Sequence, residues 1–459
     1  MLLISLKKLT PRVFSTGSAP DSVFGGRQLL ILMIVAVITI AIDSEIGFVA
    51  DFIQSQLSSS WGIAVFIGVA SIFAIGQHFV LAYVKQINKE TRARALHLGL
   101  IHSVVSIAQY ILAAILAIVI LQILATQQYN IAALYASYAV SYGLWIVTLG
   151  LLAKAFSSWY KSSSKNVVVL ILTLSMIAYV INGVTGLATN LDFLTQHKTV
   201  ISSGDIAQFP EFSIASLGSQ IDTANQIASS IAYILTWIGT VKLLYPYIKK
   251  LGKIKFWIIM SLAIVYYLIY FPLFVLGYFT PSENLDAMTN ILIISLGGIF
   301  TGIIFGAAFL LAARSLQKEI SLRNHLLLAA YGFLLFYLAG SATASQAAYP
   351  PFGLVSVSFT GLSCYLIYSG LYSSAVTVSQ DMVLRSSIRK SVTEHSRFLE
   401  SIGTAEMEQQ LKSRVLTITK KISNKMVEET GVEASMTEDD IKRHIEMVRE
   451  EIHKINSRN

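Results

Sequence analysis

Residues 340–378 read GSATASQAAYPPFGLVSVSFTGLSCYLIYSGLYSSAVTV and contain no charged side chain. Small and neutral polar residues crowd this stretch, and charge returns only after it, at Asp381 and Arg385. An α-helix needs about 20 mainly apolar residues to cross a lipid bilayer. We therefore interpret the stretch as the outer turn of a membrane hairpin followed by a membrane span.

The same alternation of apolar segments and charged loops repeats along the chain. The 459 residues are 54% hydrophobic and only 13% charged, whereas soluble domains carry about 25% charged residues. The predicted fold class is all-α: a polytopic transmembrane bundle of about ten helices in residues 23–380, between an N-terminal segment, residues 1–22, and a helical tail, residues 381–459. The predicted spans are residues 28–42, 61–84, 98–125, 131–153, 166–190, 223–246, 256–279, 288–313, 326–346 and 352–378.

Lysine and arginine are sorted to one side of the predicted membrane. The N-terminal segment and the four loops on its side hold 19 Lys/Arg and three acids. The opposite loops hold nine acids, among them Asp43, and one base, Lys198. Because loops rich in Lys and Arg stay on the cytoplasmic side, we predict a multi-pass protein of the cell (plasma) membrane with both termini in the cytoplasm.

Two sets of small residues recur at every fourth position. Gly298, Gly302 and Gly306 form a stripe on the eighth span, and Gly340 and Ala344 share this spacing at the end of the ninth. Small residues at this spacing let two helices approach closely. We interpret both sets as helix-packing seams, with a dimer interface or a gate as the alternative.

The tail carries two short heptad patterns. The first consists of Leu411, Val415, Ile418 and Ile422, and the second of Ile441, Ile445, Val448, Ile452 and Ile455, with Gly431 between them. Apolar residues at alternating steps of 4 and 3 form the seam of a coiled coil. The tail is therefore predicted to form an antiparallel helical hairpin, to dock on the membrane domain, or to pair with a second copy or another protein.

The spans offer little reactive chemistry. No Asp, Glu, Lys or Arg lies at a predicted midplane, and such residues mark proton and ion pathways. The sequence also contains no nucleotide-binding loop, zinc-site spacing or serine-hydrolase motif. We expect a protein that is not an enzyme, holds no cofactor and binds no nucleic acid.

Tyrosines at helical spacing form the leading candidate for a ligand site or pathway. The candidates, from three spans, are Tyr142, Tyr267, Tyr270, Pro272, Tyr365 and Tyr368. A tyrosine hydroxyl at mid-depth needs a partner, and a proline within a span frees a backbone carbonyl. If the three faces converge, they line an uncharged polar cavity; the alternative is a tyrosine-rich packing core.

Two further groups are binding candidates. His78 and His102 are predicted at similar depth on adjacent spans, where a facing pair would ligate a haem or a metal. The alternative is that each histidine is hydrogen-bonded within the bundle. Arg385, Arg389 and Lys390 follow the last span directly, where basic residues contact the anionic headgroups of the lipid bilayer.

Residues 346–391 read QAAYPPFGLVSVSFTGLSCYLIYSGLYSSAVTVSQDMVLRSSIRKS. This block resembles a segment that recurs in uncharacterised polytopic membrane proteins of archaea. The resemblance covers about a tenth of the chain. It implies a family of multi-pass membrane proteins, but no activity and no functional residues.

Three functions fit these observations. The leading hypothesis is a membrane sensor or scaffold, in which the bundle meets a lipid or a small external ligand and the tail passes its state to a partner. The second is a secondary carrier for a neutral or amphipathic solute, built from five-plus-five inverted repeats. The third is a structural subunit of a larger membrane complex.

Overall fold

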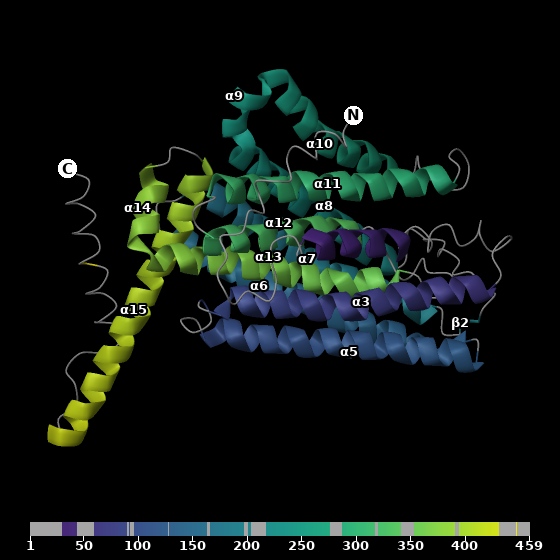
Figure 1. Cartoon of the computed structure of the whole chain (residues 1–459), viewed down its shortest axis with the longest axis horizontal. Helices are drawn as coiled ribbons and strands as arrows, with labels where there is room; N and C mark the ends of the chain where they lie inside the picture. The colour runs from purple at the N-terminus through teal and green to yellow at the C-terminus, as the bar shows by residue number, and fades with distance from the viewer. Residues whose placement is uncertain are drawn as a thin grey trace.

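The computed structural model describes residues 30–43, 59–89, 91, 96–126, 128–162, 166–196, 201–202, 217–275, 287–316, 320–340, 353–390, 394–430 and 447. Helices make up nearly all of these residues, and most of them lie side by side in one bundle (Figure 1). The predicted all-α membrane bundle is therefore confirmed. The N-terminal segment, residues 1–22, lies outside the described residues.

A short helix, Leu30–Asp43, comes first. The longer helices that follow are α3 (Ser59–Ile87), α5 (Leu96–Thr126), α6 (Ile131–Ser162), α7 (Val167–Gln196), α8 (Leu217–Leu244), α10 (Lys253–Val275), α11 (Ala287–Ser315), α12 (Ile320–Gly340), α13 (Leu354–Gln380) and α15 (Glu394–Thr430). The short elements are the 3-10 helix η1 (Tyr245–Tyr247), α9 (Ile248–Leu251) and α14 (Met382–Lys390). Strands β1 (Gln128–Tyr129) and β2 (Ile201–Ser202) pair antiparallel, with Gln128 opposite Ser202.

Eight helices in the described part of the chain are long and apolar enough to cross a membrane: α3, α5, α6, α7, α8, α11, α12 and α13. Each overlaps one of the ten predicted spans, although α12 begins six residues before the predicted ninth span, residues 326–346. The first predicted span corresponds to the shorter apolar helix Leu30–Asp43. The seventh corresponds to α10, whose side chains are described only as far as Ile264.

The outer helices turn large apolar side chains away from the bundle. On α5, Leu100 is 67%, Ile107 is 61% and Leu121 is 65% exposed. An apolar surface of this kind is unfavourable in water and is matched by the hydrocarbon of a bilayer. The exposed faces therefore fit contact with lipid.

Helix α13 lies in the middle of the bundle, and all of its residues from Leu354 to Val376 are buried (Figure 1). Its small residues allow neighbouring backbones to come close. A Cβ added to Gly361 would lie 3.0 Å from the carbonyl oxygen of Ser141 on α6, and one added to Gly370 would lie 2.5 Å from the backbone nitrogen of Ala329 on α12. The uncharged stretch thus occupies the centre because its neighbours can pack directly on its backbone.

The glycine stripe on α11 faces α12. Added Cβ atoms at Gly302 and Gly306 would lie 2.8 and 2.7 Å from the carbonyl oxygens of Leu334 and Ala330. Gly298 lies one turn before them on the same helix. At Gly340, by contrast, an added Cβ would meet nothing within 4 Å, and Ala344 lies outside the described residues.

Helices α3, α6, α8 and α11 each carry a basic residue in their last turn: Lys85, Lys161, Lys242 and Arg314. We call this end of the bundle the basic end. Helix α13 leads to it, and α14 and α15 follow there (Figure 1). The first half of α15 packs on the basic end, and its second half projects away from the bundle (Figure 1).

Candidate functional site

Glu406 on α15 is the centre of a polar cluster at the basic end. Its side chain is 5% exposed. It accepts hydrogen bonds from Trp159 Nε1 on α6 at 2.9 Å and from Tyr372 Oη on α13 at 3.1 Å. Gln410, one turn further along α15, donates a third bond at 2.9 Å. Burying a carboxylate is costly unless it is hydrogen-bonded, so these neutral donors hold α15 against two membrane helices.

Aromatic rings surround this carboxylate. The ring of Tyr372 stacks on Trp159 at 5.7 Å and on Tyr368 at 5.6 Å between centroids. His97, near the start of α5, meets Tyr372 edge-on at 5.1 Å. The cluster therefore joins α5, α6, α13 and α15 at one point, and a shift of α6 or α13 changes the donors that face Glu406.

The contact between α15 and the bundle extends beyond Glu406. Phe398 packs against Phe156 of α6, with ring centroids 6.4 Å apart. A Cβ added to Gly403 would overlap the side chain of Val378 on α13, so the two helices touch there. The buried apolar residues of this segment are Phe398, Leu399, Ile402 and Ala405. This first half of α15 is therefore part of the core.

His395 fixes the beginning of α15. Its imidazole is 3% exposed. Its Nε2 lies 3.0 Å from the carbonyl oxygen of Ala308 on α11, and its ring meets Tyr247 edge-on at 5.8 Å. Burial lowers the pKa of His395 from 6.5 to about 4, although the bond to Ala308 partly opposes this effect. The docked helix thus holds His395 neutral at pH 7.

Acid is expected to weaken the docking of α15. Undocked His395 regains an ordinary pKa of about 6.5, so between pH 6.5 and 4 the undocked state binds more protons. The contribution of neutral His395 to the free energy of docking is therefore complete above pH 6.5. It decreases as the pH falls towards 4, by up to about 1.4 kcal/mol per pH unit. Distances between spin labels at Lys154 on α6 and Ser413 on α15 measure this change. The variant His395→Gln should lose this pH dependence. If the label distance changes equally with pH in the wild type and in His395→Gln, the prediction is wrong.

A second polar network joins α7 and α8. Asn182 Nδ2 donates to Asn225 Oδ1 at 2.8 Å, and Thr185 donates to the same oxygen at 3.1 Å. Two turns towards the basic end, Ser175 and Thr236 share a hydrogen bond at 2.5 Å. These neutral groups bond mainly to each other and to nearby carbonyls, so they bind the two helices together inside the apolar bundle.

Three tyrosines continue this network into the neighbouring helices. Tyr179 on α7 accepts a bond from Thr236 at 3.1 Å and is hydrogen-bonded to Tyr337 on α12. Tyr233 on α8 donates to the carbonyl oxygen of Ala263 on α10 at 2.6 Å. Its ring lies 6.0 Å from that of Tyr337. The bundle therefore contains a convergent tyrosine group, formed by tyrosines other than the predicted ones.

The described members of the predicted tyrosine set face different neighbours. Tyr142 accepts a hydrogen bond from Asn190 on α7 at 3.3 Å. Tyr365 is hydrogen-bonded to His102 on α5 at 2.8 Å, and Tyr368 belongs to the stack at the basic end. The side chains of Tyr267, Tyr270 and Pro272 lie outside the described residues. Whether the three faces converge on a cavity or form a packing core is therefore untested, because the α10 side chains lie outside the described residues.

The two candidate histidines have separate partners. His78 is exposed and its Nδ1 lies 2.9 Å from Tyr110 Oη on α5. Tyr110 is eight residues beyond His102 along α5, a rise of about 12 Å. His78 therefore contacts α5 about two turns beyond His102, and each of the two imidazoles is hydrogen-bonded to a tyrosine. Within the described ranges, no group of three His, Cys, Asp or Glu side chains is placed to hold a metal ion.

The basic residues after α13 lie on α14. Arg385 is partly buried and its guanidinium contacts the sulfur of Met407 on α15. The backbone of Arg389 and Lys390 completes α14, and their side chains are outside the described residues. Of the three predicted lipid contacts, Arg385 therefore also packs against α15.

The structure places Asp43 in a different environment from the predicted outer loop. It was predicted as one of the acids in the outer loops, yet its side chain is fully buried. One carboxylate oxygen accepts bonds from both the backbone nitrogen and the hydroxyl of Ser356, each at 2.7 Å. Gly353, before α13, has a φ of 89° and provides no side-chain cap. Asp43 thus supplies from a distant helix the acceptor that the first turn of α13 needs.

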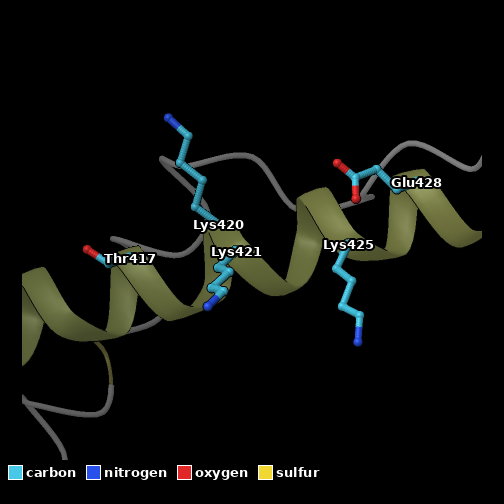
Figure 2. A pocket seen from close by; sticks show the side chains of 5 residues that line it. All are labelled: Thr417, Lys420, Lys421, Lys425 and Glu428. Atoms are coloured by element: carbon cyan, nitrogen blue, oxygen red, sulfur yellow. The ribbon is translucent and has the colours of Figure 1, made fainter.

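A hollow on the projecting half of α15 is lined by Thr417, Lys420, Lys421, Lys425 and Glu428. Figure 2 shows Lys420 on one side of the helix and Lys421 and Lys425 on the other. Lys420 therefore points away from Lys421 and Lys425, so the three ammonium groups do not surround one binding site for an anion.

Sequence reasoning missed Glu406, Trp159 and the group formed by Tyr179, Tyr233 and Tyr337. One available signal was the pair Asn182 and Asn225, since amides within apolar spans usually bond across helices. No local signal marked Glu406, because its two donors from the bundle lie 247 and 34 residues away in the chain.

Comparison of the chain with models of protein families, with curated proteins and with solved structures gives no match. The class of the protein therefore follows from its fold. It is a multi-pass helical membrane protein whose helix α15, after the last membrane helix α13, packs on one end of the bundle.

Proposed function

We propose that the protein is a membrane sensor or scaffold that couples the state of its bundle to its C-terminal tail. In this proposal the basic end faces the cytoplasm of a cell, as the distribution of lysine and arginine predicts. The bundle responds to lipid or to a small external ligand, and the tail presents the response to a protein partner or to a second copy. Catalysis plays no part in this function.

The observation that carries the proposal is the burial of Glu406 between α6 and α13. Its two donors from the bundle, Trp159 and Tyr372, belong to different membrane helices. A relative movement of these helices separates the donors, and a buried carboxylate that loses a donor is destabilised by about 1–3 kcal/mol. Docking of α15 is therefore sensitive to the arrangement of the bundle, which is the property that a sensor requires.

The network between α7 and α8 supports this function over transport of a solute. Its hydroxyl and amide groups are hydrogen-bonded to one another, as in the Asn182–Asn225 and Ser175–Thr236 pairs. Polar groups that line a solute pathway instead face a water-filled cavity. The network thus fits a packed bundle that changes state as a unit.

A substitution far from α15 tests the coupling. Gly361 lies 11 residues before Tyr372 on α13, about 16 Å along the helix. Gly361→Ala places a methyl group 3.0 Å from the backbone of Ser141 and pushes α6 and α13 apart. We expect hydrogen exchange in residues 394–410 of the full chain in nanodiscs to accelerate roughly fivefold, as about 1 kcal/mol of lost docking predicts.

The matched control is Gly143→Ala on α6, where an added Cβ meets nothing within 4 Å. This variant should leave exchange in residues 394–410 unchanged. If Gly361→Ala changes exchange only around its own position and leaves α15 like the control, α15 does not report the state of the bundle, and a purely structural role replaces the proposal.

A further inference from the structure

The projecting half of α15 exposes a continuous apolar stripe. Leu411, Val415, Ile418 and Ile422 lie on one helical face and are 53%, 42%, 57% and 54% exposed. An exposed stripe of this kind on a helix that has left the bundle is normally covered by another helix. The sequence beyond α15 indicates which helix covers it.

The second heptad pattern mirrors the first about Gly431. The first stripe has steps of 4, 3 and 4, and Ile441, Ile445, Val448 and Ile452 repeat these steps. In an antiparallel arrangement Ile422 is then opposite Ile441, Ile418 opposite Ile445, Val415 opposite Val448 and Leu411 opposite Ile452. Each pair joins an a position to a d position, as an antiparallel coiled coil requires. The midpoint of all four pairs falls between Gly431 and Val432, where glycine allows a turn.

Charge favours the same pairing. Residues 411–430 hold five Lys/Arg and two acids, whereas residues 432–451 hold seven acids and three Lys/Arg. The register that aligns the apolar residues places Lys425 opposite Glu438 and Lys412 opposite Glu451. It also places Lys420 opposite Arg443 and Lys421 opposite Lys442, so the attraction comes from the opposite net charges of the two segments. Figure 2 shows Lys425 and Lys421 on one side of α15. A helix that carries excess acid is therefore attracted to this half of α15.

We infer that residues 432–455 fold back on α15 and cover its apolar stripe as an antiparallel hairpin within one chain. The occupant is thus a segment of this chain, in preference to a second copy or a separate protein. The inference does not depend on the proposed function, because it concerns only the half of α15 that projects from the bundle.

Disulfide formation in the full-length protein tests the register. Ile418→Cys with Ile445→Cys brings two thiols into one layer, whereas Ile418→Cys with Ile452→Cys displaces them by seven residues, about 10 Å. Disulfides need Cβ atoms about 4 Å apart. Mild oxidation should give an intrachain disulfide at least about tenfold faster in the first pair. The single native cysteine, Cys364, is buried and remains in place.

The single variant Ile418→Cys tests whether a second copy of the chain covers the apolar stripe. Under the inference it stays monomeric on oxidation, and the rate for the first pair is independent of protein concentration. A disulfide-linked dimer of Ile418→Cys, or of the first pair, assigns the stripe to a second copy and overturns the inference. Equal rates for the two cysteine pairs also overturn it, because they remove the register.

Discussion

Glu406→Ala is expected to release the first half of α15 from the bundle. The substitution leaves the indole of Trp159 and the hydroxyl of Tyr372 without their acceptor in a buried site. Each of the two unsatisfied donors costs about 1–3 kcal/mol, so docking should weaken by about 2–6 kcal/mol. Hydrogen exchange in residues 394–410 of the protein in nanodiscs should then accelerate roughly 30- to 20,000-fold.

Glu406→Gln is the matched control for this prediction. The glutamine keeps one carbonyl acceptor and the shape of the side chain, so it can retain a bond to one of the two donors. Its effect should lie between those of the wild type and Glu406→Ala. If Glu406→Ala exchanges no faster than the wild type, docking depends on the apolar residues around Phe398 and the role given to the carboxylate is wrong.

Gly370→Ala is expected to be the most disruptive addition of a single methyl group at the centre of the bundle. The new Cβ would lie 2.5 Å from the backbone nitrogen of Ala329 and 2.6 Å from the carbonyl oxygen of His325. Backbone atoms cannot rotate aside, so α12 and α13 must separate. Overpacking of this kind costs about 3 kcal/mol, which should appear as a lower Tm in thermal unfolding of the detergent-solubilised protein.

The same substitution at Gly76 on α3 provides the comparison. No atom lies within 4 Å of an added Cβ there, and alanine is favoured over glycine in a helix by up to about 1 kcal/mol. Gly76→Ala should therefore leave the Tm unchanged or raise it. A Tm for Gly370→Ala equal to that for Gly76→Ala contradicts the close approach of α12 and α13.

The candidate sites show where sequence reasoning reached its limit. Tyr365 and His102 were each recognised as side chains that need a partner, but their mutual bond depends on how α5 packs against α13. The sequence left open whether the tyrosines of three spans converge, and the structure brings together Tyr179, Tyr233 and Tyr337, which helical spacing had not singled out. Helical spacing gives the face on which a residue lies, and it does not give the helix that the face meets.

Asp43 illustrates the same limit for charge. It was placed in the outer loop after the span 28–42 and is instead the last residue of the helix Leu30–Asp43. Whether its carboxylate meets water or Ser356 depends on contact between residues 313 positions apart. Helix α15 of the tail contains both buried and exposed residues. Phe398 and Glu406 are buried against the bundle, whereas Ile418 is exposed.

Hydropathy and charge in the sequence determined the class of the protein and the positions of most of its helices, because a helix in lipid must satisfy its own backbone and keep its surface apolar. Tertiary structure alone decided that α13 is the central helix, that Glu406 is held by two membrane helices and that Asp43 caps α13. These features depend on the distances between helices. Glycine contacts and buried hydrogen bonds between residues far apart in the chain determine those distances, so a local sequence pattern does not predict them.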